Sequence, residues 1–248
     1  MTICGIALGG NIGKTADRFR AALTELKQRG LLVKSVSSFH ATPAMGAHAG
    51  SEFLNAAALV ETTKSAFSTL TILHEIEDQL GRLRSTHWGP RTIDLDLIFF
   101  GDDVIDRHDI VVPHPHLWYR RFVLNPFSEI APEWVHPVLN ESIEGLVNRL
   151  NRRPLMIQVA LPDTTSLEWD SLKQGCADAA AGNDVIFVQS VDANIRENIA
   201  ARIAIVPAVK GSADRSQPKN SPRREITVEA DSETEVIQCV RDVVTAML

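Results

Sequence analysis

Trp88-Gly89-Pro90-Arg91-Thr92-Ile93-Asp94-Leu95-Asp96-Leu97-Ile98-Phe99-Phe100 is the stretch around which this sequence is organised. Gly89-Pro90 predicts a loop, and the branched and aromatic residues that follow predict a strand. Side chains alternate between the two faces of a strand. Asp94 and Asp96 are therefore expected on one face, and the opposite face is expected to carry Ile93, Leu95, Leu97 and Phe99.

Two neighbouring carboxylates at the start of an apolar strand repel each other unless a positive charge lies between them. Magnesium bound by one or two carboxylates and by substrate phosphates is a recurring solution. Arg91, Arg82 and Arg84 supply guanidinium groups suited to phosphate oxygens. The stretch therefore indicates phosphoryl transfer from a nucleotide. The alternative is an edge strand with solvated aspartates that hinder aggregation.

The composition is that of an ordinary globular protein. The 248 residues are 44% hydrophobic and 23% charged, enough for one large domain or two smaller ones. The sequence contains no long apolar run, and its N-terminus has no basic segment of a signal peptide, so no membrane association is expected. Three distant cysteines show neither a disulfide framework nor zinc spacing, which predicts a cytoplasmic protein.

Charge is distributed unevenly along the chain. Residues 1–153 carry 16 basic and 17 acidic residues, whereas residues 154–248 carry 9 and 14. No basic stripe stands out, so we expect no nucleic-acid partner.

Hydrophobic periodicity predicts an alternation of strands and helices in residues 1–150. The helix over Ala66–Leu80 is expected to turn one apolar face inward, with His74 and Glu77 adjacent on its flank. That pair is more often solvated than functional. The apolar face comprises Phe67, Leu70, Leu73, Ile76 and Leu80. The other predicted strands are 2–9, Leu31–Phe39, Phe53–Thr63 and Ile110–Val112, and the other helices are Thr15–Gly30, Asn125–Ile130 and Ser142–Leu150.

Three further features indicate a ligand site. Asn55 beside Phe53 suits a flat heterocycle, although a hydrogen bond at the strand end is the more common use of such an amide. His114, fixed between two prolines, is a candidate phosphate ligand, since no third ligand for zinc lies at a usable spacing. The Gly9–Gly13 turn lacks the pattern of a phosphate loop and is interpreted as a strand-to-helix connection.

Several ordered blocks of residues 1–150 together resemble the 6-hydroxymethyl-7,8-dihydropterin pyrophosphokinase family of folate biosynthesis. The resemblance implies an α+β fold with a ferredoxin-like, mainly antiparallel sheet and flanking helices, in a domain over residues 1–153. The blocks are Ala7–Asn11, Ser37–Pro43, Phe53–Ala57, Gly81–Arg84, His87–Asp96, Val112–Pro115, Arg120–Leu124 and Glu129–Glu133.

The resemblance also implies the reaction and its residues. Pyrophosphate passes from ATP to the pterin hydroxymethyl group and AMP is released, with two Mg²⁺ ions held by Asp94 and Asp96. The implied catalytic residues are Arg82, Arg91, Asp94 and Asp96; the ATP contacts are His74, Glu77, Arg84, Trp88, Leu97, His114 and Arg120; and the pterin contacts are Thr42, Pro43, Met45, Phe53, Asn55 and Phe122.

Some positions depart from the family pattern. His74, Asp109 and Pro115 stand where relatives can carry other nucleotide-contacting residues, which puts individual ATP contacts in doubt. His87 stands where an arginine is frequent, which weakens the expected hold of its loop on phosphate.

Residues 154–248 lie outside the resemblance. Their alternation predicts a small α/β or α+β domain, too short for a pteroate synthase barrel. We see no nucleophile or metal cluster there and expect self-association or binding of a pathway partner. The predicted strands are Leu155–Leu161, Asp184–Gln189, Ile203–Ala208 and Glu225–Glu229, and the predicted helices are Leu167–Ala181, Ala193–Ala201 and Glu233–Met247.

The residues disfavour two alternatives to an active pyrophosphokinase. An inactive scaffold that binds pterin or nucleotide would show damage at its key residues. These residues are all intact: Asp94, Asp96, Arg82, Arg91 and His114. Another Mg²⁺-dependent phosphotransferase would not need Phe53, Asn55 and Phe122, which suit a flat bicyclic ring. The small-molecule substrates expected are ATP and the pterin.

Overall fold

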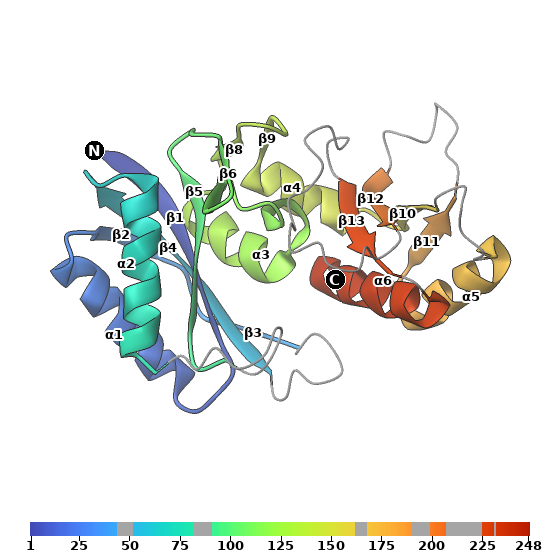
Figure 1. Ribbon diagram of the computed structural model, residues 1–248, viewed down its shortest axis with the longest axis horizontal. Helices are drawn as coiled ribbons and strands as arrows, with labels where there is room; N and C mark the ends of the chain where they lie inside the picture. Colours follow the sequence, from blue (N-terminus) through green and yellow to red (C-terminus); the bar gives the residue numbers. More distant parts are fainter. Residues whose placement is uncertain (44–51, 82–90, 162–167, 190–198, 207–224, 231) are drawn as a thin grey trace. The chain divides into compact units, whose positions relative to one another are not determined.

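The computed structural model (Figure 1) describes residues 1–43, 52–81, 91–161, 168–189, 199–206, 225–230 and 232–248. They form two compact units, Met1–Val147 and Asn148–Leu248. The division lies within helix α4 (Ile143–Asn151), slightly before the expected boundary at residue 153. Among the described residues, none of the helices has the length and apolarity needed to cross a membrane.

The first unit is built on an antiparallel sheet with the order β2-β4-β1-β5. A fifth strand, β3, pairs with the start of β4. This order, with one helix after β1 and one after β4, is the ferredoxin-like arrangement, so the predicted α+β class is confirmed. The elements are β1 (Thr2–Gly10), α1 (Thr15–Gln28), β2 (Leu32–Val36), β3 (His40–Thr42), β4 (Phe53–Thr62), α2 (Ala66–Gln79) and β5 (Asp94–Phe100). The strand predicted over Leu31–Phe39 is thus shorter, and a separate strand follows it.

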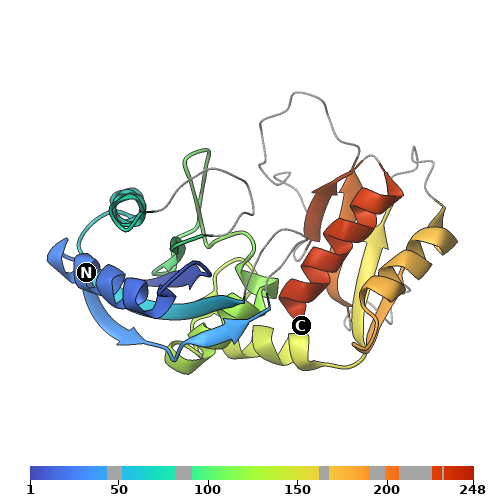
Figure 2. The same ribbon diagram turned by 90° about the horizontal axis from the view of Figure 1, so that it is seen from below.

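The two faces of this sheet are covered by different helices, as Figure 2 shows for α2 and for α3 (Arg121–Ile130). Buried Ile6, Leu8 and Leu95 belong to the core that packs under α1 and α2. On the opposite face a side chain at Gly5 would collide with Phe99 and Phe127, at 2.4 and 2.8 Å from an added Cβ. Glycine at this position therefore lets α3 approach the sheet closely.

A β-bulge interrupts the predicted alternation of side chains along β5, so one predicted face is wrong beyond it. Ile6 lies opposite Leu97 but the next residue back, Gly5, lies opposite Phe99, so Ile98 is the extra residue. Because a bulge reverses the faces beyond it, Phe99 does not share the face of Leu97. Its ring stacks on Trp134 instead, with centroids 4.2 Å apart.

The predicted inward face of α2 is also partly wrong. Phe67 is 52% exposed, whereas Leu73 and Ile76 are fully buried. The face that packs on the sheet is centred on Ala66, Thr69, Leu73, Ile76 and Glu77. This stripe includes a carboxylate, so apolarity alone did not identify it.

The remaining elements of the first unit follow β5. The strand predicted over Ile110–Val112 exists and pairs with β6 in a hairpin. Helix α3 begins at Arg121, four residues before the prediction, and contains Pro126. Inside the helix Pro126 lacks the N–H that would bond the carbonyl of Phe122, so one backbone hydrogen bond is lost. The elements are β6 (Ile105–Arg107), β7 (Ile110–Val112), a 3₁₀ helix (Leu117–Tyr119), α3, β8 (Val135–His136), β9 (Glu141–Ser142) and α4.

The second unit contains a parallel sheet with the order β11-β10-β12-β13. Helices α5 and α6 lie side by side on one face of it (Figures 1 and 2), and Gly175 of α5 makes room for Ile237 of α6. The elements are β10 (Leu155–Ala160), α5 (Trp169–Ala179), β11 (Val185–Val188), β12 (Ile199–Val206), β13 (Glu225–Glu229) and α6 (Glu233–Met247).

One prediction in the second unit is wrong where it can be compared. The predicted helix over 193–201 ends in Ile199–Ala201, which belong to strand β12. Ile203 and Ile205 alternate with alanine and arginine at the period of a strand, and pairing with β10 extends this strand backward to Ile199. Residues 193–198 lie outside the described part.

Candidate active site

The two aspartates lie on the face of the first sheet that α3 covers, which we call the site face. Asp94 pairs with Gly9 and Asp96 with Ala7 of β1. An added Cβ at Gly9 would lie 3.8 Å from Asp94 Cβ and 3.5 Å from Asn55 Oδ1. Because Gly9 and Ala7 have almost no side chain, the floor between β4 and β5 is open for a ligand.

Arg91 is held in place by the turn after β1. Asn11 Oδ1 accepts a hydrogen bond from Arg91 N at 2.8 Å, and Arg91 O accepts from Asn11 N at 2.9 Å. An added Cβ at Gly10 would lie 2.9 Å from the Thr92 carbonyl oxygen, so this contact requires glycine. The turn read from sequence as a plain connection therefore positions a candidate catalytic arginine. Asn11 ends the block Ala7–Asn11 that carries the family resemblance, but the sequence alone provides no reason to assign it this role.

The Arg91 side chain donates to Asp94 Oδ2 at 2.7 Å. Both groups are partly exposed, so the pair is accessible to ligands. A guanidinium held beside one of two neighbouring carboxylates offsets part of their mutual repulsion. The same guanidinium has further N–H groups for phosphate oxygens.

Glu77 is fully buried, and its Oε1 accepts a hydrogen bond from Leu95 N at 2.7 Å. Leu95 lies between the two aspartates, so Glu77 of α2 fixes the backbone that carries both. His74, predicted beside it, is exposed on the same helix. The two residues are one helical turn apart, as predicted, but only His74 is exposed to a ligand.

His114 and Arg120 lie in the segment between β7 and α3. His114 N donates to Ile98 O at 2.8 Å, and His114 Nδ1 accepts from His116 N at 3.1 Å. Burial, and then the charge of Arg120, lower the pKa of His114 to about 3, although Asp94 opposes the shift. His114 is therefore neutral at pH 7, and because Nδ1 is an acceptor, Nε2 carries the proton and can donate to an oxyanion.

A cavity of about 230 Å³ adjoins Asp96 and His114. Leu97, Pro115 and Asp109 line it. The Asp109 carboxylate accepts a hydrogen bond from Arg107 Nε at 3.1 Å. Half of its lining residues belong to the β6–β7 hairpin, where sequence reasoning singled out only Asp109; the additional lining residues are Leu70, His108, Ile110, Val111 and Val112.

A second group of candidate residues lies across the floor from the aspartates. Asn55 is buried, and its Nδ2 donates to Thr42 Oγ1 at 2.8 Å. Thr42 pairs with Phe53 in the β3–β4 ladder, so these three side chains share the site face. Phe122 enters from α3, and the guanidinium carbon of Arg120 lies 5.6 Å from its ring centroid. Pro43 follows β3 and is exposed.

Four of the predicted site residues, Met45, Arg82, Arg84 and Trp88, lie outside the described part of the chain, as does His87. Of the described ones, the site face brings together Asp94, Asp96, Asn55, Phe53 and Thr42. Within the described residues no group of three or more His, Cys, Asp or Glu side chains could hold a metal. Two carboxylates two residues apart on one strand, about 6.6 Å between their Cα atoms, still match what magnesium takes from a protein when phosphates supply further oxygens.

The chain is similar to known proteins over most of its first unit. Residues 5–132 match the model of the family described as 7,8-dihydro-6-hydroxymethylpterin-pyrophosphokinase (HPPK). The chain is 38% identical over 147 residues to a Synechocystis 2-amino-4-hydroxy-6-hydroxymethyldihydropteridine pyrophosphokinase, covering 59% of this chain and 75% of that protein. It is 39% identical over 132 residues to the Bacillus subtilis protein of the same name, covering 53% and 79%.

A solved HPPK-DHPS structure in complex with substrates covers 83% of this chain and 68% of its own. It shares 12% sequence identity with this chain at a TM-score of 0.47, a likeness too low to carry an argument. The second unit lies outside the family match.

Proposed function

The chain belongs to the 7,8-dihydro-6-hydroxymethylpterin-pyrophosphokinase family, and on that premise we propose how its residues divide the work on the two substrates. The enzyme transfers pyrophosphate from ATP to the hydroxymethyl group of 6-hydroxymethyl-7,8-dihydropterin, a step of folate biosynthesis. ATP is its co-substrate.

The aspartate side of the site face holds the triphosphate. Asp94 and Asp96 bind two Mg²⁺ ions, which when present neutralise phosphate charge and orient the phosphate chain. The Arg91 guanidinium, paired with Asp94 in the structure, has N–H groups left for phosphate oxygens. His114 donates through Nε2 as a neutral group. Further contacts to ATP come from His74, Arg82, Arg84, Trp88, Leu97 and Arg120, whereas Glu77, which is fully buried, acts through the Leu95 amide.

The opposite side holds the pterin. Asn55 and Thr42 form a buried polar pair that can present an amide edge to the heterocycle. Phe53 on β4 and Phe122 on α3 supply aromatic faces on either side of a flat ring. Pro43 and Met45, directly after β3, complete this set.

The reaction needs little covalent help from the protein. The substrate hydroxyl oxygen bonds to the β-phosphorus, the bond from that phosphorus to the α,β-bridging oxygen breaks, AMP leaves, and the hydroxyl proton passes to solvent. Catalysis is therefore mainly positioning and charge neutralisation.

The observation that supports this division best is the position of Gly9. Gly9 lies between Asn55 and Asp94 and has no side chain. The space above its backbone, between these two residues, is therefore open. A pterin held at Asn55 and a triphosphate held at Asp94 would therefore meet above the floor formed by Gly9.

The test is the Mg²⁺ dependence of AMP formation in Asp94→Asn and the pterin dependence in Phe53→Ala. We expect Asp94→Asn to need at least tenfold more Mg²⁺, because it loses one of the ion's charged ligands. Phe53→Ala should raise the pterin KM about 2- to 13-fold, since one aromatic stacking contact is worth about 0.5–1.5 kcal/mol. Unchanged Mg²⁺ and pterin curves would contradict the assignment.

For the second unit we keep the expectation of a non-catalytic domain for self-association or a pathway partner, in a cytoplasmic enzyme. Its parallel sheet with two helices on one face supports a separate folded body. Sedimentation of the full chain and of residues 1–153 tests it. A change from a larger assembly to a monomer on truncation is the expected result, and identical assembly of both would contradict self-association.

A further inference from the structure

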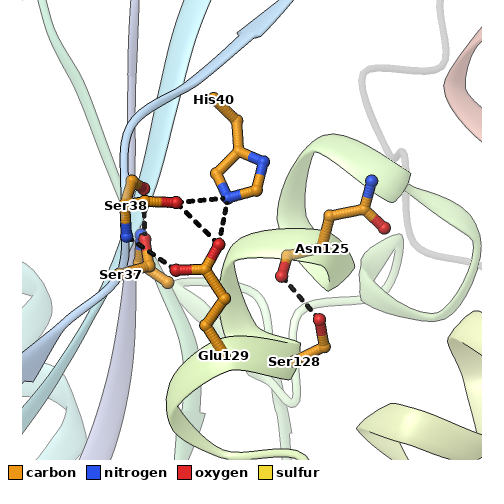
Figure 3. A network of polar contacts seen from close by, with 7 residues as sticks. Ser37, Ser38, His40, Asn125, Ser128 and Glu129 are labelled. Carbon is orange, nitrogen blue, oxygen red and sulfur yellow. Dashed lines mark hydrogen bonds and ion pairs between the residues drawn. The ribbon is translucent and has the colours of Figure 1, made fainter.

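A cluster of hydrogen bonds joins α3 to the segment between β2 and β3 (Figure 3). Glu129 Oε2 accepts from Ser38 N at 2.7 Å, and Glu129 Oε1 accepts from Ser38 Oγ at 2.7 Å. His40 Nε2 lies 2.7 Å from the same Oε1. One carboxylate on a helix therefore gathers three groups from the edge of the sheet. We call Ser38, His40 and Glu129 the α3 clamp.

The clamp lies on the same surfaces that carry the pterin residues. His40 and Thr42 are two apart on β3 and so share a face, and His40 pairs with Asn55 of β4. On α3, Glu129 follows Phe122 by seven residues, which is about two turns, so both lie on one side of the helix. The clamp and the proposed pterin residues therefore occupy the same face of the sheet and the same side of the helix.

The distances along the chain are short. Seven residues of helix separate Glu129 from Phe122 by about 10.5 Å, and two residues of strand separate His40 from Thr42 by about 6.6 Å. A rotation or shift of α3 about the clamp would thus change directly the separation between Phe122 and Phe53, the two aromatic faces proposed for the ring.

Apolar contacts also hold α3 against the sheet. The Phe127 ring packs at 5.4 Å from Phe99, but because apolar packing is not directional it specifies the orientation of the helix less closely than hydrogen bonds do. The carboxylate bonds are directional, and they use both oxygens. Hydrogen bonds from Ser38, first from its hydroxyl and then from its amide, lower the pKa of Glu129, which keeps the carboxylate ionised at neutral pH.

The exposure of the clamp argues against a role in stability alone. The Glu129 side chain is 37% exposed and His40 27%. Polar contacts at such exposure contribute little to the free energy of folding. They can still select one orientation of a helix that apolar packing already holds.

We propose that Glu129, through Ser38 and His40, is a positioning residue that sets the width of the pterin slot between α3 and the β3–β4 edge. This inference rests on the proposed pterin site. Glu129 does not contact either substrate in this proposal; it acts through the orientation of α3.

The experiment is calorimetric titration of the full chain with 6-hydroxymethyl-7,8-dihydropterin, in the presence of Mg²⁺ and saturating α,β-methylene-ATP, and with the nucleotide analogue alone. We expect Glu129→Ala to weaken pterin binding about tenfold, which equals about 1.4 kcal/mol, and to leave the affinity for the analogue unchanged. Glu129→Gln and Ser38→Ala each remove only part of the clamp, so they should weaken pterin binding less. The matched control is Glu133→Gln, an exposed carboxylate just beyond α3, which should bind both ligands as the parent does.

Each other outcome has a defined meaning. Parent-like pterin affinity in Glu129→Ala, with the loss still seen in Phe53→Ala, would overturn the clamp and leave the pterin site standing. An unaffected Phe53→Ala would refute the pterin site itself. Equal weakening of both ligands in Glu129→Ala would indicate a general structural defect and also overturn the proposal. Should Glu129→Ala fail to fold, Glu129→Gln and Ser38→Ala decide by the same criteria.

Discussion

Replacing Glu77 tests how the aspartate strand is held. Its buried carboxylate accepts the amide of Leu95, which lies between Asp94 and Asp96. In Glu77→Ala that buried amide loses this acceptor, which costs about 1–3 kcal/mol, and the cavity left behind adds about 1–2 kcal/mol. We expect the free energy of unfolding to fall by about 2–5 kcal/mol in total.

Activity should fall further than stability. Small displacements of reacting groups, of about 1 Å, can cost about 100-fold in rate. At a temperature where Glu77→Ala is fully folded, we therefore expect AMP formation at least tenfold below the parent. Glu77→Gln keeps an oxygen acceptor for Leu95 N and should lie within about 1 kcal/mol of the parent in stability, with near-parent activity.

The assay is urea unfolding followed by circular dichroism, together with steady-state AMP formation. The control is Glu75→Gln. Glu75 lies on the same helix as Glu77, and its exposed side chain pairs with Arg29. Its replacement should change stability by less than about 1 kcal/mol. Parent-like stability and activity in Glu77→Ala would refute the reasoning. Loss of activity in Glu77→Gln equal to that in Glu77→Ala would show that the charge itself acts on ATP or the metal.

The remaining predictions concern the floor, acid stability and the second unit. Gly9→Ala should fold, because its Cβ makes ordinary contacts at 3.5 and 3.8 Å, but bind both substrates more weakly; Gly10→Ala, with a Cβ 2.9 Å from Thr92 O, should lose stability. Thermal unfolding and substrate titration distinguish the two, and equal behaviour would contradict the geometry. His136 Nδ1 accepts hydrogen bonds from the backbone amides of Val138 and Leu139, and burial lowers the pKa of His136 to about 4. The unfolded chain takes up this proton near pH 6.5, so the contribution of His136 is complete above that pH and is lost as the pH falls towards 4. His136→Asn should therefore flatten the decline of unfolding free energy across pH 6.5 to 4 by about 3 kcal/mol, and an unchanged slope would contradict a buried neutral imidazole. Residues 1–153 alone should fold and form AMP; an insoluble or inactive fragment would show that the second unit is part of the first unit's core.

Local pattern in the sequence was enough to predict much of the first unit. The alternation of Asp94, Leu95 and Asp96 predicted a shared face for the carboxylates, and the structure places that face under α3. Turn residues predicted the ends of α1 and α2 closely. These features depend on neighbours in the chain, which is why they can be read from it.

What the sequence did not predict depends on distant contacts. Asn11 and Arg91 are eighty residues apart, and their hydrogen bonds exist only because β1 and β5 are neighbours in the sheet. Glu77 looked like part of a solvated flank because the burial of a carboxylate follows from the amide of Leu95 that it meets. The bulge at Ile98 reversed Phe99 without any mark in the sequence.

The central claim is that Asp94 and Asp96 on the site face support pyrophosphate transfer to a pterin held beside them. Its most direct test is AMP formation by the full chain, measured with and without 6-hydroxymethyl-7,8-dihydropterin and Mg²⁺, in the parent and in Asp96→Ala. The account predicts AMP only when pterin and Mg²⁺ are both present, and none above background from a folded Asp96→Ala. Retained pterin-dependent AMP formation in Asp96→Ala would contradict it.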